Sequence, residues 1–145
     1  MKFEFTIPGK PVGKQRPKFG NGRTYTPAQT TTYENYVKLR FKQAYPDAEP
    51  IAAKVATAAV ITAYFPIPQS ASKKRKAEME AGEILPTVKA DLDNIAKIIL
   101  DSLNGLAFYD DAQVIELHVH KRYAEIPTVD VQIMLYADYR YRYKP

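Results

Sequence analysis

DLDNIAKIILDSLNG, residues 91–105, is the stretch of this chain with the clearest structural signal. Projected on a helix at about 100° per residue, its apolar side chains fall on one face. That face continues beyond the stretch and consists of Leu92, Ile95, Ala96, Ile99, Leu103 and Leu106. The pattern predicts an amphipathic helix that begins near Asp91–Asp93 and ends at Asn104-Gly105, a pair typical of helix C-caps.

The polar side chains of this helix form a single stripe on the flank of the apolar face. The stripe contains Asp93, Lys97, Asp101 and Asn104, while Asp91 lies at or before the helix start. Ordinary structural roles are open to these residues. Asp91 or Asp93 could be a helix N-cap, and Asp93 with Lys97 could be a surface ion pair.

A second acidic pair, Asp110-Asp111, follows the helix and precedes a segment rich in β-branched residues. Alone, such a pair usually marks a turn. If the following strand packs beside the helix start, however, three or four carboxylates converge, and they repel one another unless a cation neutralises them. Oxygen ligands without His or Cys suit Mg²⁺ or Mn²⁺. With Lys97 available to meet a phosphate, these are the parts that metal-assisted phosphodiester hydrolysis needs.

Four further segments read as strands, because they alternate in polarity or are rich in β-branched residues. They are residues 2–7, 54–65, 112–123 and 128–137, the last two joined by a turn around Pro127. The order of strands and helices along the chain predicts one small α+β domain over residues 1–145, with a mixed sheet and two main helices.

The first of these helices should open at Pro27, with Thr26 as its N-cap, and run to about Ala44. Its buried stripe is expected to consist of Tyr33, Val37 and Phe41. A shorter helix from Ser70 to Ala81, stopped by Gly82, is also possible.

Basic side chains gather in three segments. The first is a Gly/Pro-rich loop or hairpin over residues 10–25, with Lys10, Lys14, Arg16, Lys18 and Arg23. The second is the cluster Lys73, Lys74, Arg75 and Lys76. The third is the tail, residues 139–145, in which Tyr alternates with Arg or Lys. Each could contact phosphate or bases, or be plain solvated surface. His118 and His120 share one face of a predicted strand and are interpreted as ordinary strand residues, since a metal site needs more ligands.

The composition favours a globular protein that binds a polyanion. The chain has 145 residues, 46% hydrophobic and 26% charged, with a net charge of +5 and no cysteine. Disulfides and thiolate metal sites are thereby excluded. No apolar run approaches the roughly 20 residues that span a bilayer, so we expect a cytoplasmic protein without a membrane partner.

Taken together, the motifs resemble the RusA family of Holliday-junction resolvases. They are DLDNxxK at 91–97, DxLN at 101–104 and DDAQV at 110–114, with GKPxGKQRP at 9–17 and RTYTP at 23–27 similar to the N-terminal pattern of many phage-borne and prophage-borne members. The resemblance spans roughly residues 3–135. One departure is Ala90, where members commonly have Pro or Arg before the first aspartate.

The resemblance implies a homodimeric, Mg²⁺-dependent endodeoxyribonuclease with a RusA-like fold, for which Mn²⁺ is a possible substitute. Such an enzyme resolves four-way junctions by paired symmetric cuts in recombination and repair, without a small-molecule cofactor. The resemblance assigns the metal to Asp91, Asp93 and Asp111, with Asp110 less certain, and adds Lys97 as a catalytic residue. The Lys and Arg residues of the loop and of the 73–76 cluster become candidate DNA contacts.

Two points stay open. The same chemistry could act on other branched DNA, such as flaps or forks, and a non-catalytic DNA-binding module could use the acids only as caps and turns. The dimer interface is not marked in the sequence. Apolar residues of the strand around Val55 to Phe65, and those after Asp111, are the candidates.

Overall fold

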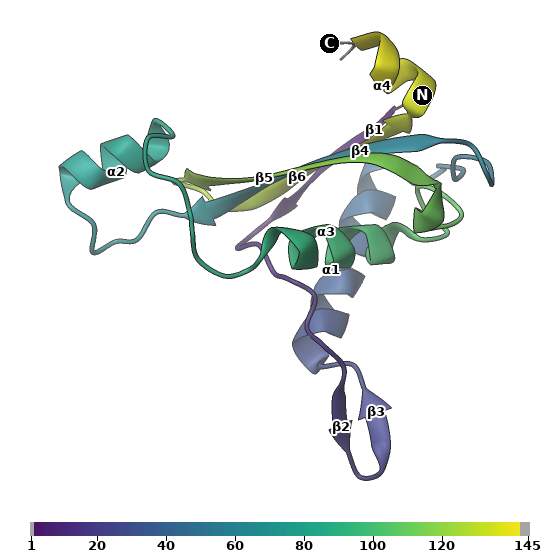
Figure 1. Ribbon diagram of the computed structural model, residues 1–145, viewed down its shortest axis with the longest axis horizontal. Coiled ribbons are helices and arrows are strands. Elements are labelled where there is room, and N and C mark those ends of the chain that lie inside the picture. The colour runs from purple at the N-terminus through teal and green to yellow at the C-terminus, as the bar shows by residue number, and fades with distance from the viewer. Residues whose placement is uncertain (1, 143–145) are drawn as a thin grey trace.

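A mixed β-sheet forms the centre of the computed structural model, which describes residues 2–142 (Figure 1). Its strands are β1 (Lys2–Pro8), β4 (Thr57–Pro66), β5 (Val114–Ala124) and β6 (Thr128–Leu135), in the order β1-β6-β4-β5. Strand β6 is antiparallel to β1 and β4, whereas β4 and β5 are parallel. Parallel neighbours need a crossover, and here it contains α2 (Lys73–Glu80) and α3 (Leu92–Leu103). The predicted α+β class with a mixed sheet is confirmed.

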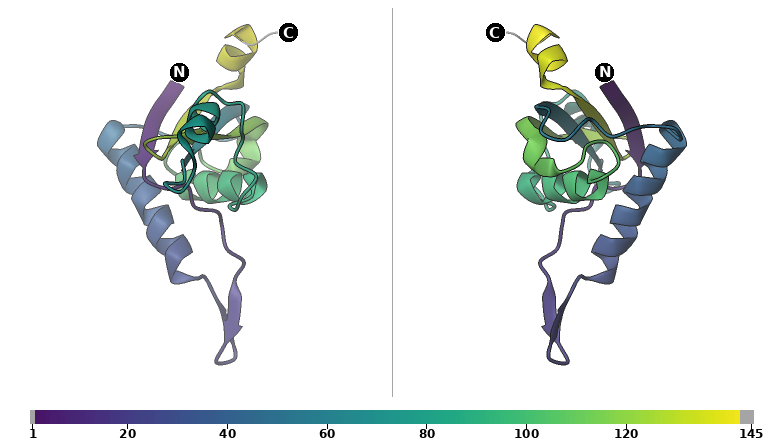
Figure 2. Two further views of the ribbon diagram at one scale, coloured as in Figure 1. Left: turned by 90° about the vertical axis from the view of Figure 1, so that its left-hand side faces the viewer. Right: turned by 90° about the vertical axis from the view of Figure 1, so that its right-hand side faces the viewer.

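Helices α1 (Ala28–Ala44) and α3 cover one face of this sheet (Figures 1 and 2). Helix α1 buries Tyr33, Val37 and Phe41, as its spacing predicts, together with Thr30. The Phe41 ring meets the rings of Phe3 and Phe5 edge to face, with centroids 5.2 and 5.4 Å apart. Among residues 2–142, no helix combines the length and the apolar character required to cross a membrane.

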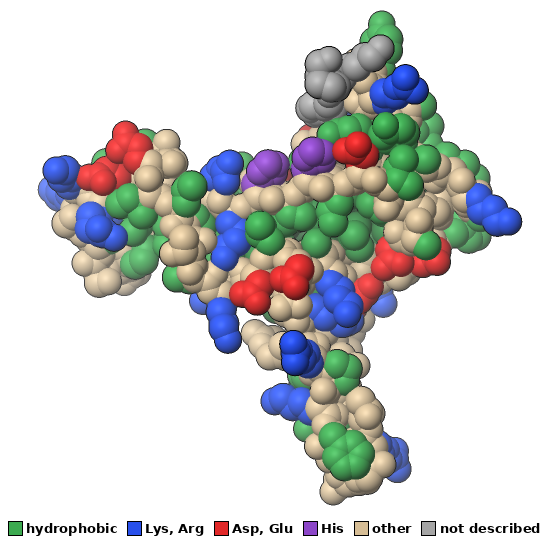
Figure 3. Space-filling model, in the orientation of Figure 1, with side chains coloured by type: hydrophobic (Ala, Val, Ile, Leu, Met, Phe, Trp, Pro, Cys, Tyr) green, Lys and Arg blue, Asp and Glu red, His purple; other side chains and the backbone are tan. Residues whose placement is uncertain are grey.

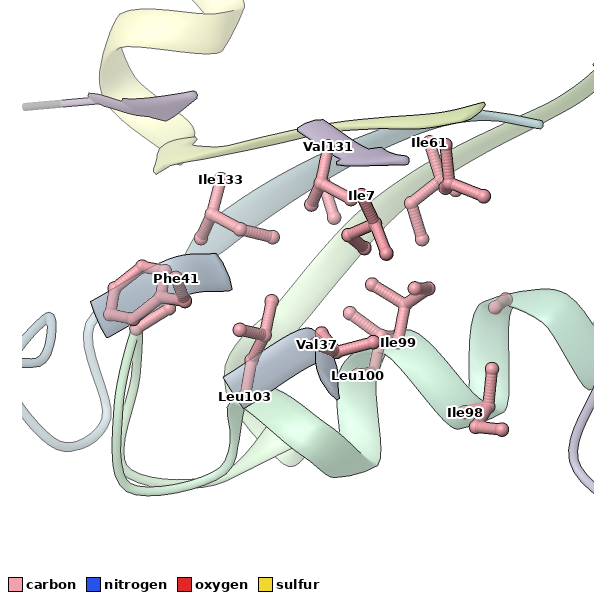
Figure 4. Packing of buried hydrophobic residues seen from close by; sticks show 14 of the residues in the cluster. Ile7, Val37, Phe41, Ile61, Ile98, Ile99, Leu100, Leu103, Val131 and Ile133 are labelled. Carbon is pink, nitrogen blue, oxygen red and sulfur yellow. The ribbon is translucent and has the colours of Figure 1, made fainter. Parts of the chain in front are cut away.

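Helix α3 lies with its apolar face against the sheet, and Figure 4 shows Ile99 and Leu103 beneath Ile61, Val131 and Ile133. The predicted bounds of this helix are confirmed, with Asp91 at the N-cap position and Asn104 at the C-cap. The prediction of a buried Leu92 is wrong, since its side chain is 44% exposed. As the first residue of the helix, Leu92 precedes the turns that lie over the sheet.

Other predicted boundaries shift by a few residues for local reasons. Helix α1 has Pro27 rather than Thr26 at its N-cap position, and no side chain caps it. Strand β4 begins at Thr57 rather than residue 54, because Lys54 has a left-handed φ of 66° that an extended strand does not accommodate. Helix α2 begins after Ser72, whose hydroxyl accepts a bond from the Arg75 N–H, and Gly82 follows its end as predicted.

The last predicted strand is too long at its C-terminal end. Strand β6 ends at Leu135, and residues 136 and 137 belong to a further helix, α4 (Tyr136–Arg142). In this helix the rings of Tyr136 and Tyr139 stack with centroids 6.3 Å apart, a contact that the i,i+3 spacing of a helix permits. The described beginning of the tail, residues 139–142, is therefore helical.

A small hairpin projects from this body (Figures 1 and 2). It consists of β2 (Lys18–Gly20) and β3 (Arg23–Tyr25) and lies within the predicted basic segment 10–25. The strands are joined by Asn21-Gly22, whose φ angles of 50° and 74° are both positive. Two such residues make the tight turn whose twist matches a β-hairpin.

Gln113 anchors the turn that leads from α3 into β5. Its side-chain oxygen accepts bonds from the backbone N–H groups of Tyr109 and Asp110, at 2.9 and 3.0 Å. Its side-chain amide donates to the carbonyls of Ala52 and Val55, at 2.7 and 3.1 Å. One buried side chain thus joins two loops that are distant in the sequence and holds the acidic pair in place.

Gln113→Ala should lower the free energy of unfolding by about 2 kcal/mol or more, because the substitution leaves several backbone groups without partners. Urea unfolding followed by circular dichroism measures the change. Gln132→Ala is the matched control, since the Gln132 side-chain oxygen is buried but has no hydrogen-bond partner. If both variants lose the same free energy of unfolding, the hydrogen bonds of Gln113 do not stabilise the fold.

Candidate active site

Asp91, Asp93 and Lys97 are exposed side chains at the first turns of α3. Asp91 has the N-cap position, yet its side chain makes no capping hydrogen bond. Within residues 2–142, Asp93 and Lys97 also do not form the ion pair that their spacing permits. The ordinary structural roles considered for these residues are therefore not realised, and both carboxylates and the ammonium group face solvent.

Asp111 lies at the other end of α3, where a second group of carboxylates gathers. Its backbone N–H donates to the Asn104 side-chain oxygen at 2.9 Å. Burial raises the pKa of Asp111, and hydrogen bonding and repulsion from Asp110 and Asp101 raise it further. The neighbouring carboxylates of Asp101 and Asp110 thus disfavour the ionised form of Asp111, an effect that a nearby cation would relieve.

The two acidic groups are separated along the helix. Asp91 precedes Asp101 by ten residues, which at 1.5 Å per residue corresponds to about 15 Å. Figure 3 shows acidic side chains in two groups along α3, with basic side chains between them. Asp101 had no assigned catalytic or metal role in the sequence, although it lies on the predicted polar stripe.

The acids converge only if the residues at the beginning of the strand after Asp111 lie beside the start of α3, and the structure does not meet this condition. Only a short connection separates Asn104 from Asp111, so β5 has to begin at the C-terminal end of the helix. The strand then runs back along it, and Lys121, near the far end of β5, donates to the Val88 carbonyl just before α3. Asp111 consequently contacts the helix end and not Asp91 or Asp93.

Among residues 2–142, no three acidic or histidine side chains are arranged so that together they could hold a metal ion. The donor chemistry nevertheless suits a hard cation, because both acidic groups offer oxygen atoms only. A shared metal between Asp91, Asp93 and Asp111 therefore stays a prediction.

Lys14 connects the basic loop to the second acidic group. Its ammonium lies 3.2 Å from carboxylate oxygens of both Glu34 and Asp101. Burial lowers the pKa of Lys14, but the bonds to Asp101 and Glu34 outweigh that effect and raise it above its ordinary value. The side chain proposed as a DNA contact is thus already engaged with two carboxylates. The sequence analysis did not identify Glu34 as part of the site. The only signal for it is that Glu34 follows the buried Thr30 by four residues on α1 and so lies on the same side of the helix.

The loop is held against the start of α3. A Cβ on Gly13 would lie 2.8 Å from the Cβ of Ala90 and 3.1 Å from that of Asn94, so only glycine fits this approach. The Lys14 N–H then donates to the Asn94 carbonyl at 2.9 Å. A hollow of about 430 Å³ results, and among the residues lining it are Lys10, Lys14, Lys89 and Asp91.

The other basic residues lie on two arms of the molecule. Arg16, Lys18 and Arg23 are on or beside the hairpin, and Lys73 to Lys76 are on α2. Figure 3 shows basic side chains on both arms, with acidic side chains on the surface between them. Positive arms around an acidic centre are compatible with a phosphate backbone that is held on both sides of a reacting bond.

Within the described residues, the two histidines and the beginning of the tail belong to no metal-binding group of three or more side chains. His118 and His120 alternate along β5, and His118 contacts Glu116 at 3.3 Å and the ring of Tyr139. The predicted tail begins within α4, and its residues 143–145 lie outside the described part of the chain.

Comparison with known proteins agrees with the resemblance. Residues 8–134 match the family model described as endodeoxyribonuclease RusA. The chain is also 37% identical over 140 residues to "Uncharacterized protein YqaN" of Bacillus subtilis (strain 168), a match that covers 90% of this chain and 94% of that protein. A match of this extent includes both acidic groups, Lys97 and the basic loop, and the chain therefore belongs to the RusA family of endodeoxyribonucleases, which act on Holliday junctions.

Proposed function

We propose that this protein is a metal-dependent, structure-selective endodeoxyribonuclease that resolves Holliday junctions by paired symmetric cuts in DNA recombination and repair. The observation that carries the proposal is the polar stripe of α3, on which exposed Asp93 and Lys97 lie between Asp91 and Asp101. A buried apolar face would hold that stripe rigidly toward the substrate. Because the substrate is chromosomal or phage DNA, we infer a cytoplasmic location.

The ions proposed for the reaction are Mg²⁺ and, as a substitute, Mn²⁺. The proposed ligands are Asp91 and Asp93 at the start of α3 and Asp111 at its end, where Asp101 and Asp110 are added as candidates because they lie beside Asp111. When bound, such an ion would stabilise negative charge on the phosphate and lower the pKa of an attacking water. Lys97 would place a positive charge near the same phosphate.

Phosphate contacts are proposed for the basic residues of both arms, with a distinction among them. Arg16, Lys18 and Arg23 have no acidic residue near them in the sequence, since the first acid after the loop is Glu34. Lys14 differs because Asp101 and Glu34 occupy its ammonium group. We propose that Lys14 mainly positions the loop and the carboxylate of Asp101.

Two alternatives remain as competing proposals. The same site could cut flaps or forks, since nothing in an acidic stripe selects the number of DNA arms. A non-catalytic module would use the acids only as caps and turns. Asp110 does cap the short 3-10 helix Asp111–Gln113, but the Asp91 side chain makes no capping bond, which argues against that use for the acids of α3.

Asp91→Asn, Asp93→Asn and Asp111→Asn should each reduce cleavage of a labelled four-way junction ~100-fold or more, on the scale of losing one group that stabilises the transition state. Binding without metal should be retained or tightened, because the negative field that repels phosphate is reduced. Single-turnover cleavage and fluorescence anisotropy measure the two effects. Asp101→Asn belongs in the same series, because it distinguishes a site at the end of α3 from one at its start.

Asp47→Asn is the matched control, since Asp47 is exposed in the turn after α1, outside both acidic groups. If one of the three variants cleaves at a near-native rate, the aspartate that it replaces is not a metal ligand. If all three cleave normally, the nuclease proposal for this stripe fails.

Lys97→Ala should lower the cleavage rate at saturating enzyme more than it weakens junction binding. A cation beside the reacting phosphate acts mainly on the charge that develops in the transition state. Lys42→Ala, an exposed lysine in the last turn of α1, is the control. Loss of affinity with an unchanged rate would make Lys97 a simple phosphate anchor.

A homodimer is proposed because a junction with two-fold symmetry requires two matched cuts, and a C₂ dimer supplies two equivalent sites. Most apolar residues of the strand named as a candidate interface are excluded, since Ala59, Ile61 and Phe65 of β4 are buried beneath the helices. The edge strands of the sheet are β1 and β5. Side chains of Tyr45 and Arg40 bond backbone groups of β1, whereas β5 presents Ile115 and Leu117 to solvent. Exposed apolar side chains on an unpaired edge strand favour pairing with a second chain.

Light scattering at micromolar concentration should give the mass of a dimer, and Leu117→Glu should shift it toward monomer. Leu39→Glu is the matched control, because Leu39 is 51% exposed on α1 and Leu117 is 43% exposed on β5. The monomeric variant should make single nicks instead of paired cuts in a cruciform plasmid. A wild-type monomer that still makes paired cuts would contradict the proposal.

A further inference from the structure

The hairpin β2–β3 carries a large apolar side chain that contributes nothing to the core. Phe19 is 78% exposed, and the hairpin projects from the body of the molecule (Figure 1). A two-stranded hairpin without a packed face is marginally stable in water, so an exposed phenyl ring does not help it to form. Its position calls for a partner outside the chain.

The two faces of the hairpin differ in chemistry. Phe19 pairs with Thr24 across the ladder, while Lys18 pairs with Tyr25 and Gly20 with Arg23. Because side chains alternate along a strand, Phe19 is the only aromatic residue on its face, and both cations lie on the opposite one. There the Tyr25 ring covers Gly20, whose added Cβ would lie 3.2 Å from the ring. One face therefore offers a bare ring, and the other offers Lys18, Arg23 and Tyr25.

The charge of this segment identifies the kind of partner. Lys18, Arg23 and the preceding Arg16 are basic, and no acidic residue occurs between Lys10 and Tyr33. Aromatic side chains among basic ones make up the surfaces on which nucleic-acid bases stack. Apolar side chains also serve as wedges that enter DNA at a step where bases are unstacked. A polyanion with exposed base faces fits this hairpin better than a protein surface does.

The hairpin is also coupled to the candidate active site. The loop that leads to it is fixed at the start of α3 by the Lys14 N–H bond to the Asn94 carbonyl and by the close approach of Gly13. The loop therefore fixes the base of the hairpin, which carries Phe19, relative to the helix that presents Asp93 and Lys97. A contact made by the hairpin could set which phosphate reaches the stripe.

We propose that Phe19 inserts at the branch point of the DNA substrate and stacks on a base there, while Lys18 and Arg23 hold the flanking phosphates. This inference rests on the proposed function, namely that the substrate is branched DNA. Base stacking is interrupted at a branch point, so insertion there avoids the unstacking cost that a continuous duplex imposes. The ring would thereby favour branched over linear DNA.

The test uses a four-way junction with 2-aminopurine at the branch point, and a linear duplex of the same sequence, both in EDTA so that no cleavage occurs. Full-length wild type, Phe19→Ala, Phe19→Trp and Ile126→Ala are compared by anisotropy and by 2-aminopurine fluorescence. Ile126 is the matched control, because it is also 78% exposed but lies in the turn between β5 and β6. Thermal unfolding checks that each variant is folded.

Wild type and Phe19→Trp should bind the junction equally and raise the 2-aminopurine signal. Phe19→Ala should not raise the 2-aminopurine fluorescence. Its affinity for the junction should fall about ten-fold, equivalent to roughly 1.4 kcal/mol, while its affinity for the duplex stays unchanged. Ile126→Ala should match wild type. Lys18→Gln should weaken binding to the junction and to the duplex by the same factor, because a phosphate contact does not depend on the branch point.

Three results would overturn the inference. Phe19→Ala could behave as Ile126→Ala does, or lose affinity equally for junction and duplex, or change self-association while leaving DNA binding intact. In each of these cases the wild type still binds and cuts junctions, so the proposed function stands. If the wild type shows no preference for the junction, the proposed function fails first.

Discussion

Burial of the apolar face of α3 on the sheet is the constraint from which the rest of the site follows. Ile95, Ile99 and Leu103 are almost completely buried beneath the central strands. A helix fixed in rotation by this face can point its polar stripe in only one direction. Asp93, Lys97 and Asp101 therefore lie along one outer edge, where Lys14 of the loop bonds the carboxylate of Asp101.

Much of the fold was predictable because it depends on local pattern. Helices α1 and α3 have an apolar face of helical period, and the strands have either alternation or a run of β-branched residues, so their existence and order were predicted correctly. The errors concern residues whose environment is set at a distance. Leu92 has the correct helical angle for the core but precedes the turns that reach the sheet, and Lys54 turns the chain through a left-handed conformation that no periodicity indicates.

The candidate site was predictable in its residue types but not in its geometry. The acids and Lys97 stand out in sequence, whereas the grouping of Asp111 with Asp101 depends on the short connection that follows Asn104. The ion pairs of Lys14 and the hydrogen bonds from Gln113 to Ala52 and Val55 join segments far apart in the chain, and no local pattern contains them. Comparison with known proteins establishes the RusA family, and the structure adds that the acids of its motifs form two groups at opposite ends of α3.

Cleavage of end-labelled four-way, three-way and linear duplex DNA by the wild-type protein tests the account most directly. With Mg²⁺ or Mn²⁺, we expect paired incisions at symmetric positions in opposing strands of the four-way junction, little cutting of the linear duplex, and no cutting in EDTA. Equal cutting of all three substrates, or no cutting with either ion, would contradict it.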